Sequence, residues 1–329
     1  MIRYIIKRCL NYVVMLFVAV SMTYFLASAF MDPRSNHAQI SPGKATPGYS
    51  IELSLDAANI NDRTPVIIRY FRWLGGIFTR WDWGLSPDGG HVGKEIAYRI
   101  GASVELVTGA TVLGIIIGVS LGIYTAIRQY KWQDRVLNAI STFLLVVPTA
   151  VMILAIVNLA IFINDSAEYR VFYVTGLSSY QGNNIFEYLA DFLQHLILPT
   201  ISMTISGMVG YHLTQRTYLL DTMNADYVRT ARAKGLPLNI AIRRHALRTS
   251  LIPTAVDVAF SIAGIFTGAV MTEKMYAIHG LGEYFLNTLA QNDINGATAV
   301  AAFGAVCTLS GALLADIFSA WLDPRIRLS

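Results

Sequence analysis

Charged residues are scarce in this sequence. Only 14% of its 329 residues are Asp, Glu, Lys or Arg, whereas 54% are hydrophobic, and soluble domains typically carry about 25% charged residues. The two cysteines, Cys9 and Cys307, lie far apart, which leaves no disulfide framework or metal-binding pattern and indicates small buried side chains. The composition argues against a soluble domain and favours an integral membrane protein.

A phosphate-binding loop is missing as well. The pattern Gly-x-x-x-x-Gly-Lys-Ser/Thr cradles nucleotide phosphates. The pairs Gly43-Lys44 and Gly93-Lys94 lack both the upstream glycine and the following hydroxyl. This excludes an ATPase of that type within the chain. No internal repeat is visible either, so one continuous membrane domain is the simplest expectation.

Long apolar runs are what the sequence does contain. An α-helix of about 20 residues crosses a hydrocarbon core of about 30 Å, and lipid offers no partner for unpaired backbone groups, so helices are expected. We predict an all-α membrane protein in which Pro148, Pro199 and Pro253 kink or begin helices. Its six transmembrane helices are predicted at Leu10–Phe30, Ser103–Ile127, Val136–Ile163, Leu196–Thr217, Leu251–Thr272 and Thr298–Trp321.

The first apolar run has features of a cleaved signal peptide. Arg3, Lys7 and Arg8 precede it, and Ala27-Ser28-Ala29 lies at its end. The apolar region of a signal peptide is usually about 7–15 residues long. The run Leu10–Phe30 is longer, so an uncleaved first span is predicted.

Positive charge predicts the orientation. An even number of spans places both termini on one side, and that side carries 15 of the 25 Lys and Arg residues. Because Lys and Arg accumulate on the cytoplasmic side, both termini are predicted to be cytoplasmic. The net charge of +4 then requires no nucleic-acid partner. The 15 residues are Arg3, Lys7, Arg8, Arg128, Lys131, Arg135, Arg216, Arg229, Arg232, Lys234, Arg243, Arg244, Arg248, Arg325 and Arg327.

Three external segments connect the spans. Residues 31–102 begin with turn-forming residues and continue with aromatic ones, which suit either a small cap on the lipid headgroups or a docking surface for an external partner. Residues 164–195 and 273–297 are the other two, the latter with a short amphipathic helix at Glu283–Gln291. We divide the chain into residues 1–30, an extracytoplasmic insertion at 31–102, and a core at 103–329 that holds the other five spans.

A basic, helix-forming segment, residues 218–250, separates the fourth and fifth spans. Asn224 or Asp226 could cap a first helix over Ala225–Lys234, and Gly235 suits the left-handed conformation that ends helices. A helical hairpin on the cytoplasmic side is therefore predicted.

The second half of this hairpin begins at Pro237. Proline suits the first turn of a helix, here Leu238–Arg248. In the first helix, the small residues Thr230, Ala231 and Ala233 would permit close approach by a partner. The alternative is an amphipathic loop lying on anionic headgroups.

In this basic segment the chain resembles the permease subunits of bacterial ATP-binding-cassette importers, and among them the oligopeptide/dipeptide permease family. The cytoplasmic motif of these permeases, Glu-Ala-Ala-x3-Gly-x9-Ile-x-Leu-Pro, corresponds to Arg229-Thr230-Ala231, Gly235 and His245–Arg248 with its spacing intact. Arg229 stands where the general motif has Glu, and Arg248 where it has Pro. The sequence Tyr-Val-Arg-Thr-Ala-Arg-Ala-Lys-Gly-Leu is similar to the peptide-permease version.

The resemblance extends over almost the whole chain. In the third external segment His279 stands where proline is usual. The further segments that resemble the family are Ile2-Arg3-Tyr4 with Lys7-Arg8, Asp82–Ser86, Glu273 with Gly280 and Gly282, and Asp323–Arg327.

The resemblance implies the fold of a type I importer and a set of partners. These are a second homologous permease subunit, two ATPase subunits that bind ATP and Mg, and an extracytoplasmic substrate-binding protein, all at the bacterial cytoplasmic membrane. The chain itself would be a transporter subunit without a cofactor, not an enzyme. The residues implied in coupling to the ATPases are Arg229, Thr230, Ala231, Arg232, Lys234, Gly235, His245, Ala246 and Leu247.

Ionisable residues inside apolar spans are costly and often functional. Asp257 and Asp316 lie within the fifth and sixth spans, where we expect a paired or hydrogen-bonded role rather than a proton relay. Glu105 is expected at the membrane interface. His195 and His212 flank the fourth span without a carboxylate at helical spacing, so they are expected to be interface and packing residues rather than ligands.

Two other functions are compatible with parts of this pattern. A proton-coupled secondary carrier could use Asp257 and Asp316, although such carriers usually contain internal repeats. A membrane scaffold or receptor could use the external aromatic segment. Within the importer hypothesis, the cargo could be dipeptides, longer peptides, nickel chelates or another small solute.

Overall fold

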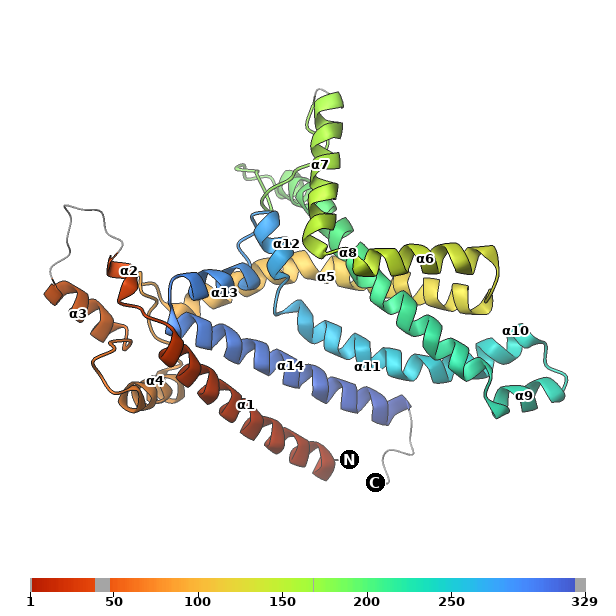
Figure 1. Cartoon of the computed structure of the whole chain (residues 1–329), viewed down its shortest axis with the longest axis horizontal. Coiled ribbons are helices and arrows are strands. Elements are labelled where there is room, and N and C mark those ends of the chain that lie inside the picture. The colour runs from red at the N-terminus through yellow and green to blue at the C-terminus, as the bar shows by residue number, and fades with distance from the viewer. Residues whose placement is uncertain (1, 39–47, 168, 323–329) are drawn as a thin grey trace. The chain divides into compact units, whose positions relative to one another are not determined.

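The computed structural model describes residues 2–38, 48–167 and 169–322, and the side chains of residues 8–36, 50–167 and 169–319. These residues are almost entirely helical (Figure 1), apart from an isolated β-bridge between Leu85 and His91. A π-helical turn, Ile242–Ala246, follows α10. The α-helices are α1 (Ile2–Phe30), α2 (Ser35–Ala38), α3 (Gly48–Ala57), α4 (Val66–Arg80), α5 (Val92–Ile127), α6 (Trp132–Val146), α7 (Thr149–Ala167), α8 (Ile185–Met223), α9 (Asp226–Ala233), α10 (Leu238–Ala241), α11 (Leu247–Ile265), α12 (Val270–Met275), α13 (Leu281–Ala290) and α14 (Ile294–Leu322).

Six helical segments are long and apolar enough to cross a membrane, which confirms the number and order of the predicted spans. The amphipathic helix expected near Glu283 is present as α13. The six segments are Arg8–Phe30, Val92–Ile127, Thr149–Ala167, Ile185–Met223, Leu238–Met275 and Ile294–Ser319.

The third span differs from its predicted bounds. The run Val136–Ile163 is divided between α6 and α7, because Val147 adopts an extended conformation with φ −69° and ψ 122°. A residue that precedes proline is driven out of the helical region by contact with the proline ring. Pro148 thus separates two helices, while Pro199 and Pro253 lie inside α8 and α11.

The fifth span contains a break that was not predicted. The run Leu251–Thr272 is interrupted after Ile265, where α11 ends, and Gly268 adopts a φ of +79° before α12 begins. Glycine takes this left-handed conformation without steric conflict.

The chain forms two compact units. The first contains residues 1–103, 266–273 and 279–310, and the second contains residues 104–265, 274–278 and 311–329. Each has its own buried contacts.

An aromatic core holds the first unit together. Tyr24 of α1 lies with its ring centroid 4.8 Å from that of Trp73 and 5.5 Å from that of Tyr70, both on α4. The Ser21 and Tyr70 hydroxyls are hydrogen-bonded at 2.7 Å. Tyr70 and Trp73 therefore belong to the core, and only other aromatic residues of this segment stay available for the membrane surface or a partner.

A buried carboxylate organises the loop after α11. Glu273 is fully buried and accepts hydrogen bonds from the Ser103 hydroxyl at 2.7 Å and from the backbone N–H groups of Ala269 at 3.1 Å and Glu283 at 2.8 Å. A side chain at Gly280 would collide with the Glu273 carboxylate. The glutamate and the glycine that carried the resemblance here are therefore two parts of one packing arrangement.

The Asp82–Ser86 segment is held by an asparagine. Asn295 is fully buried and donates to the carbonyls of Ala58 at 2.8 Å and Leu85 at 2.9 Å. Gly84 adopts a φ of +94°, and a Cβ there would lie 2.7 Å from Asn295 Nδ2. This position needs glycine for its conformation and for the space that the asparagine occupies.

In the second unit, glycines on α5 allow close contact with α8. A Cβ at Gly118 would lie 2.5 Å from the Met208 carbonyl oxygen, and one at Gly122 would lie 2.8 Å from Gln215 Cβ. Gly114, one turn earlier, faces the same part of α8. Small residues at four-residue spacing let membrane helices approach closely.

Gly118→Ala is expected to destabilise the protein by about 1–3 kcal/mol, because the added methyl group overfills this contact. Gly109→Ala is a matched control on the same helix, since a Cβ there has no neighbour within 4 Å. Thermal unfolding of the purified protein in detergent measures both variants. Equal unfolding temperatures for the two would contradict the close contact.

Candidate functional site

The first half of the basic segment is the short helix α9. Its N-cap residue is Ala225, which has no side chain able to cap, so the predicted capping by Asn224 or Asp226 is wrong. Asn224 instead ends α8. The predicted helix ending is confirmed, because Gly235 adopts a φ of +92°.

Backbone hydrogen bonds close the turn after α9. The Gly235 N–H donates to the Arg232 carbonyl at 2.9 Å, and the Leu236 N–H donates to the Ala231 carbonyl at 3.3 Å. Such bonds satisfy carbonyls that the end of the helix would leave unpaired. The turn is therefore a defined structure rather than a loose loop.

The second half is not a separate helix. The prediction of an independent helix over Leu238–Arg248 is wrong, because α10 passes through the π-helical turn directly into α11 with helical dihedral angles at Ile242 and Leu247. Pro237 precedes the first residue, as expected. The segment is thus the N-terminal extension of the fifth span, and a movement at Gly235 would act directly on that span.

A buried cluster fixes this element to the core of the unit. Val228 and Ala231 of α9 pack with Ile242 and Ala246, and the same cluster includes Leu219 of α8. Ala126 at the end of α5 and Ala241 complete it. Ala231 and Ala246, two of the residues implied in coupling, are buried in this cluster.

The remaining predicted residues form the outer surface of the element. Arg229, Arg232 and Lys234 are exposed, as are Thr230 and Gly235. The other two, His245 and Leu247, are half-buried. An ion pair between Arg229 and Asp226 at 3.8 Å lies on this surface; it is exposed and contributes little to stability.

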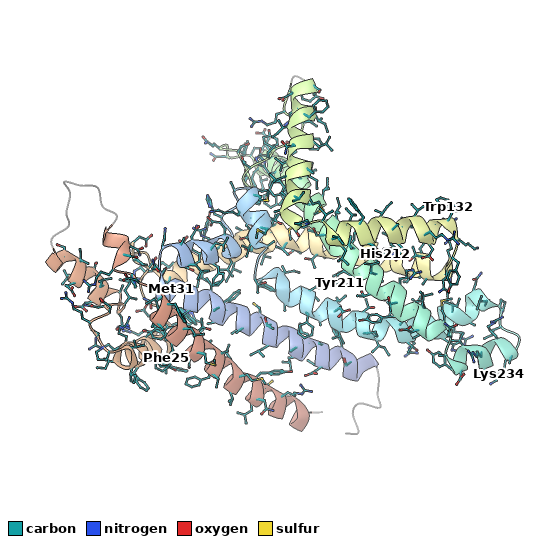
Figure 2. The ribbon with its side chains drawn as sticks, viewed as in Figure 1. Phe25, Met31, Trp132, Tyr211, His212 and Lys234 are labelled. Atoms are coloured by element: carbon teal, nitrogen blue, oxygen red, sulfur yellow. The ribbon has the colours of Figure 1, made fainter. Side chains whose placement is uncertain are left out.

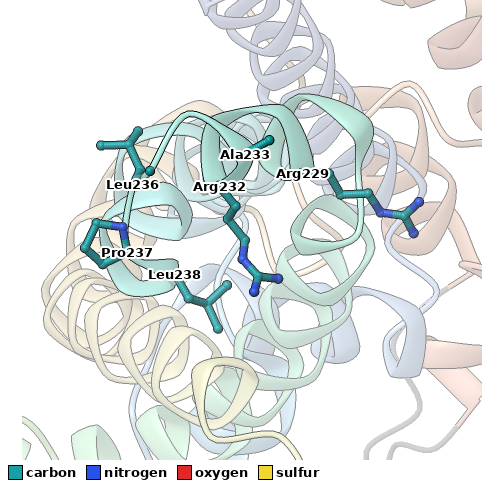
Figure 3. A pocket seen from close by; sticks show the side chains of 7 residues that line it. Arg229, Arg232, Ala233, Leu236, Pro237 and Leu238 are labelled. Atoms are coloured by element: carbon teal, nitrogen blue, oxygen red, sulfur yellow. The ribbon is translucent and has the colours of Figure 1, made fainter.

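An open hollow of about 560 Å³ lies on this surface (Figure 3). The Arg232 side chain extends along it towards Leu238, whereas Arg229 points away. The hollow combines guanidinium groups with apolar contacts, which is suited to a partner with carboxylates beside apolar side chains. Its lining consists of Arg229, Arg232, Ala233, Gly235, Leu236, Pro237 and Leu238.

A row of polar side chains on α8, Tyr211 to Arg216, lies next to this element and was not predicted as a site. His212, which Figure 2 labels on α8, is fully buried. Its Nδ1 lies 2.7 Å from the Ser141 hydroxyl of α6, and its Nε2 lies 3.0 Å from the Thr125 hydroxyl of α5. The imidazole therefore bridges two other helices. The prediction of a packing role is refined to that of a hydrogen-bonded bridge.

The same row also reaches α11. The Gln215 side-chain amide donates to the Ser250 hydroxyl at 3.0 Å and accepts a hydrogen bond from the Thr254 hydroxyl. The hydroxyls of Tyr211 and Ser261 are hydrogen-bonded as well. Because lipid cannot satisfy these groups, their pairing favours one arrangement of the helices.

Arg216 completes the row with an ion pair to α6. Its Nε and Nη2 atoms donate to the two carboxylate oxygens of Asp134 at 2.8 and 3.0 Å, and the Tyr130 N–H donates to the same carboxylate at 3.0 Å. The Arg216 guanidinium lowers the pKa of the Asp134 carboxyl below its usual value. The polar residues of α8 at positions 211, 212, 215 and 216 share one helical face, a signal that the sequence already contained.

The other ionisable residues have simpler surroundings. The expectation that His195 lacks a carboxylate at helical spacing is wrong. Asp191 lies one helical turn before His195, and its Oδ1 atom is 3.5 Å from His195 Nδ1. The Tyr211 hydroxyl donates to the backbone carbonyl of Asp257 at 3.4 Å. A pairing of Asp257 with Asp316 stays a prediction, and Glu105 is exposed on α5.

The described part of the chain contains two free cysteines and no cluster of possible metal-ligating side chains. Cys307 is buried and Cys9 is partly exposed, so the prediction of burial holds for Cys307 alone; both are free thiols. No group of three His, Cys, Asp or Glu side chains there is arranged to hold a metal ion.

Comparison with known proteins assigns this architecture to a family. Residues 118–328 match the binding-protein-dependent transport system inner membrane components. The chain belongs to this family. Residues 1–90 match the N-terminal part of such membrane components.

Named relatives cover the full length of the permease. The oligopeptide transport system permease protein OppB of Mycobacterium tuberculosis is 36% identical over 330 residues, covering 100% of both chains. The dipeptide transport system permease protein DppB of Lactococcus lactis is 28% identical with the same coverage. The oligopeptide transport system permease protein AppB of Bacillus subtilis is 29% identical over 99% of this chain and 100% of its own.

These relationships confirm the predicted resemblance to the oligopeptide and dipeptide permeases. The chain is a multi-pass membrane permease subunit of an ATP-binding-cassette importer with the type I fold, and not itself an enzyme. The carboxyl-terminal segment Asp323–Arg327, which also carried the resemblance, lies outside the described residues.

Asp134→Asn is expected to lower the free energy of unfolding of the permease by about 2 kcal/mol at neutral pH, because charge-assisted hydrogen bonds are lost. The carboxyl has a lowered pKa in the folded state. The contribution of the Asp134 carboxylate to the free energy of unfolding is therefore complete above the pKa of about 4 that it has in the unfolded state. This contribution is lost as the pH falls through the lower pKa of the folded state.

Denaturant unfolding in detergent at a series of pH values measures this difference between wild type and variant. Asp221→Asn, a change at an exposed position of α8, is the control and is expected to have little effect. A difference between wild type and Asp134→Asn that stays constant down to acidic pH would contradict the role of the ion pair.

Proposed function

We propose that this permease and a second homologous subunit form a path for peptides across the bacterial cytoplasmic membrane. One of two ATPase subunits would dock on the α9–α10 element, and an extracytoplasmic substrate-binding protein would deliver the cargo. The names of the relatives, which refer to oligopeptide and dipeptide transport, support peptides as the substrate class.

The observation that carries the coupling proposal is the construction of the α9–α10 element. Its basic outer surface is exposed, its inner surface is packed on α5 and α8, and its second half continues into α11. Force applied to a rigid, anchored helix is transmitted, whereas a flexible loop would absorb it. ATPase closure would thus move α8 and α11 together.

The energy for transport would come from the partner chains. The sequence lacks a phosphate-binding loop, so ATP and Mg would be bound by the ATPase subunits. The excess of Lys and Arg on the side of residues 218–250 supports a cytoplasmic position for the element and for both termini.

Peptide uptake into proteoliposomes tests the proposed function. We expect uptake to require ATP, both permease subunits, the ATPases and the binding protein together. A vesicle that omits only the ATPases is the control and should accumulate no peptide. Accumulation driven by a pH gradient without ATPases would contradict the proposal and support a secondary carrier.

Gly235→Pro is expected to uncouple ATP hydrolysis from uptake, because proline cannot adopt the observed φ of +92° and removes the N–H that donates to Arg232. Gly235→Asn is the matched control, since asparagine tolerates left-handed conformations. A Cβ at this position meets no neighbour within 4 Å. The ratio of peptide transported to ATP hydrolysed should fall severalfold in Gly235→Pro and stay near the wild-type value in Gly235→Asn. An unchanged ratio in both would argue against coupling through this turn.

A further inference from the structure

The helix α4, in the first unit, has two apolar faces with different surroundings. One face, with Tyr70 and Trp73, is buried against Tyr24 of α1. The other carries Ile67, Phe71 and Phe78, which at 100° per residue lie within a narrow stripe along the helix. These three side chains are 63%, 64% and 75% exposed.

The residue that ends α4 extends this stripe. Trp81 is 74% exposed and adopts a left-handed conformation with a φ of 54°. A tryptophan with an apolar ring and a polar N–H is typical of the boundary between lipid and water. Four large apolar side chains are therefore unburied on one short helix.

The charges of α4 have one sign. The helix contains Arg69, Arg72 and Arg80 and no acidic residue, and of the three arginines Arg72 and Arg80 are exposed. Arg72 lies about 100° around the helix from Phe71, at the edge of the exposed apolar face, whereas Arg80 lies on the far side of the helix. An exposed arginine at the edge of an apolar face is the pattern of helices that lie at a membrane surface, where the guanidinium group meets lipid phosphates. This favours lipid over an apolar protein groove as the occupant.

The stripe is also continuous with the surface of a membrane span. The Phe25 ring of α1 lies 4.9 Å from that of Tyr70, and the Tyr70 ring lies 5.4 Å from that of Phe71. Along α1, exposed apolar residues run from Leu10 to Phe30. A surface that contacts lipid along α1 therefore continues directly onto α4.

We propose that α4 lies on the membrane surface at which α1 ends, with Ile67, Phe71 and Phe78 inserted into lipid. Arg72, at the edge of the stripe, contacts phosphate groups of the lipids. The aromatic contacts between α1 and α4 hold this helix at a defined angle to the first span. The segment after the first span is then an anchored part of the membrane domain.

Spin labels test this arrangement in the assembled transporter in lipid nanodiscs. The native cysteines are replaced (Cys9→Ser, Cys307→Ser), and a nitroxide is attached at Phe78→Cys or, in a second protein, at Phe71→Cys. The control is Thr79→Cys, the neighbouring exposed position, which lies about 100° around the helix from Phe78.

Collision rates with oxygen, which concentrates in lipid, and with a water-soluble nickel chelate report the surroundings of each label. We expect the oxygen-to-nickel ratio to be several-fold higher for the labels at positions 78 and 71 than for the label at position 79. Low rates with both reagents would mean that protein covers the stripe, and high nickel rates would mean that water does. Either result would overturn the proposal.

Discussion

The arrangement of the second unit depends on the need to pair polar groups in an apolar environment. Tyr211, His212, Gln215 and Arg216 project from one face of α8, and each has a hydrogen-bond partner on another helix. An unpaired group of this kind in lipid would be costly. The partners come from α5, α6 and α11, so this short stretch of α8 determines which helices lie next to it.

The close contact of α5 with α8 depends on the same region. Gly118 and Gly122 let the two backbones approach opposite Met208 and Gln215, which brings Thr125 within reach of His212. Hydrogen bonds and small residues thus reinforce each other, as in other membrane helix pairs. Leu219, one turn beyond Gln215, joins the buried cluster under α9. A displacement of the α9–α10 element would therefore reach α5 and α6 through α8, and α11 both through α8 and by direct continuation.

Much of this architecture could be predicted from residues that act locally. Six apolar runs, the glycine that ends α9 and the proline before α10 depend on hydrophobicity or on allowed backbone dihedral angles, and all were predicted. The prediction that Asn224 or Asp226 caps α9 was wrong, because a capping preference is weak compared with the packing of Val228 and Ala231 that positions the helix. Asp191 and His195, four residues apart, could have been recognised from their spacing alone.

The sequence by itself determined the membrane setting, the number of spans, the basic segment between the fourth and fifth spans and the resemblance to peptide permeases. Each of these follows from composition or from short-range spacing. Only the tertiary structure decided that Ala231 and Ala246 face inward, that α10 continues into α11, and that His212 joins Ser141 to Thr125. These features depend on residues more than 70 positions apart in sequence or on which side of a helix meets its neighbours, and no local pattern specifies them.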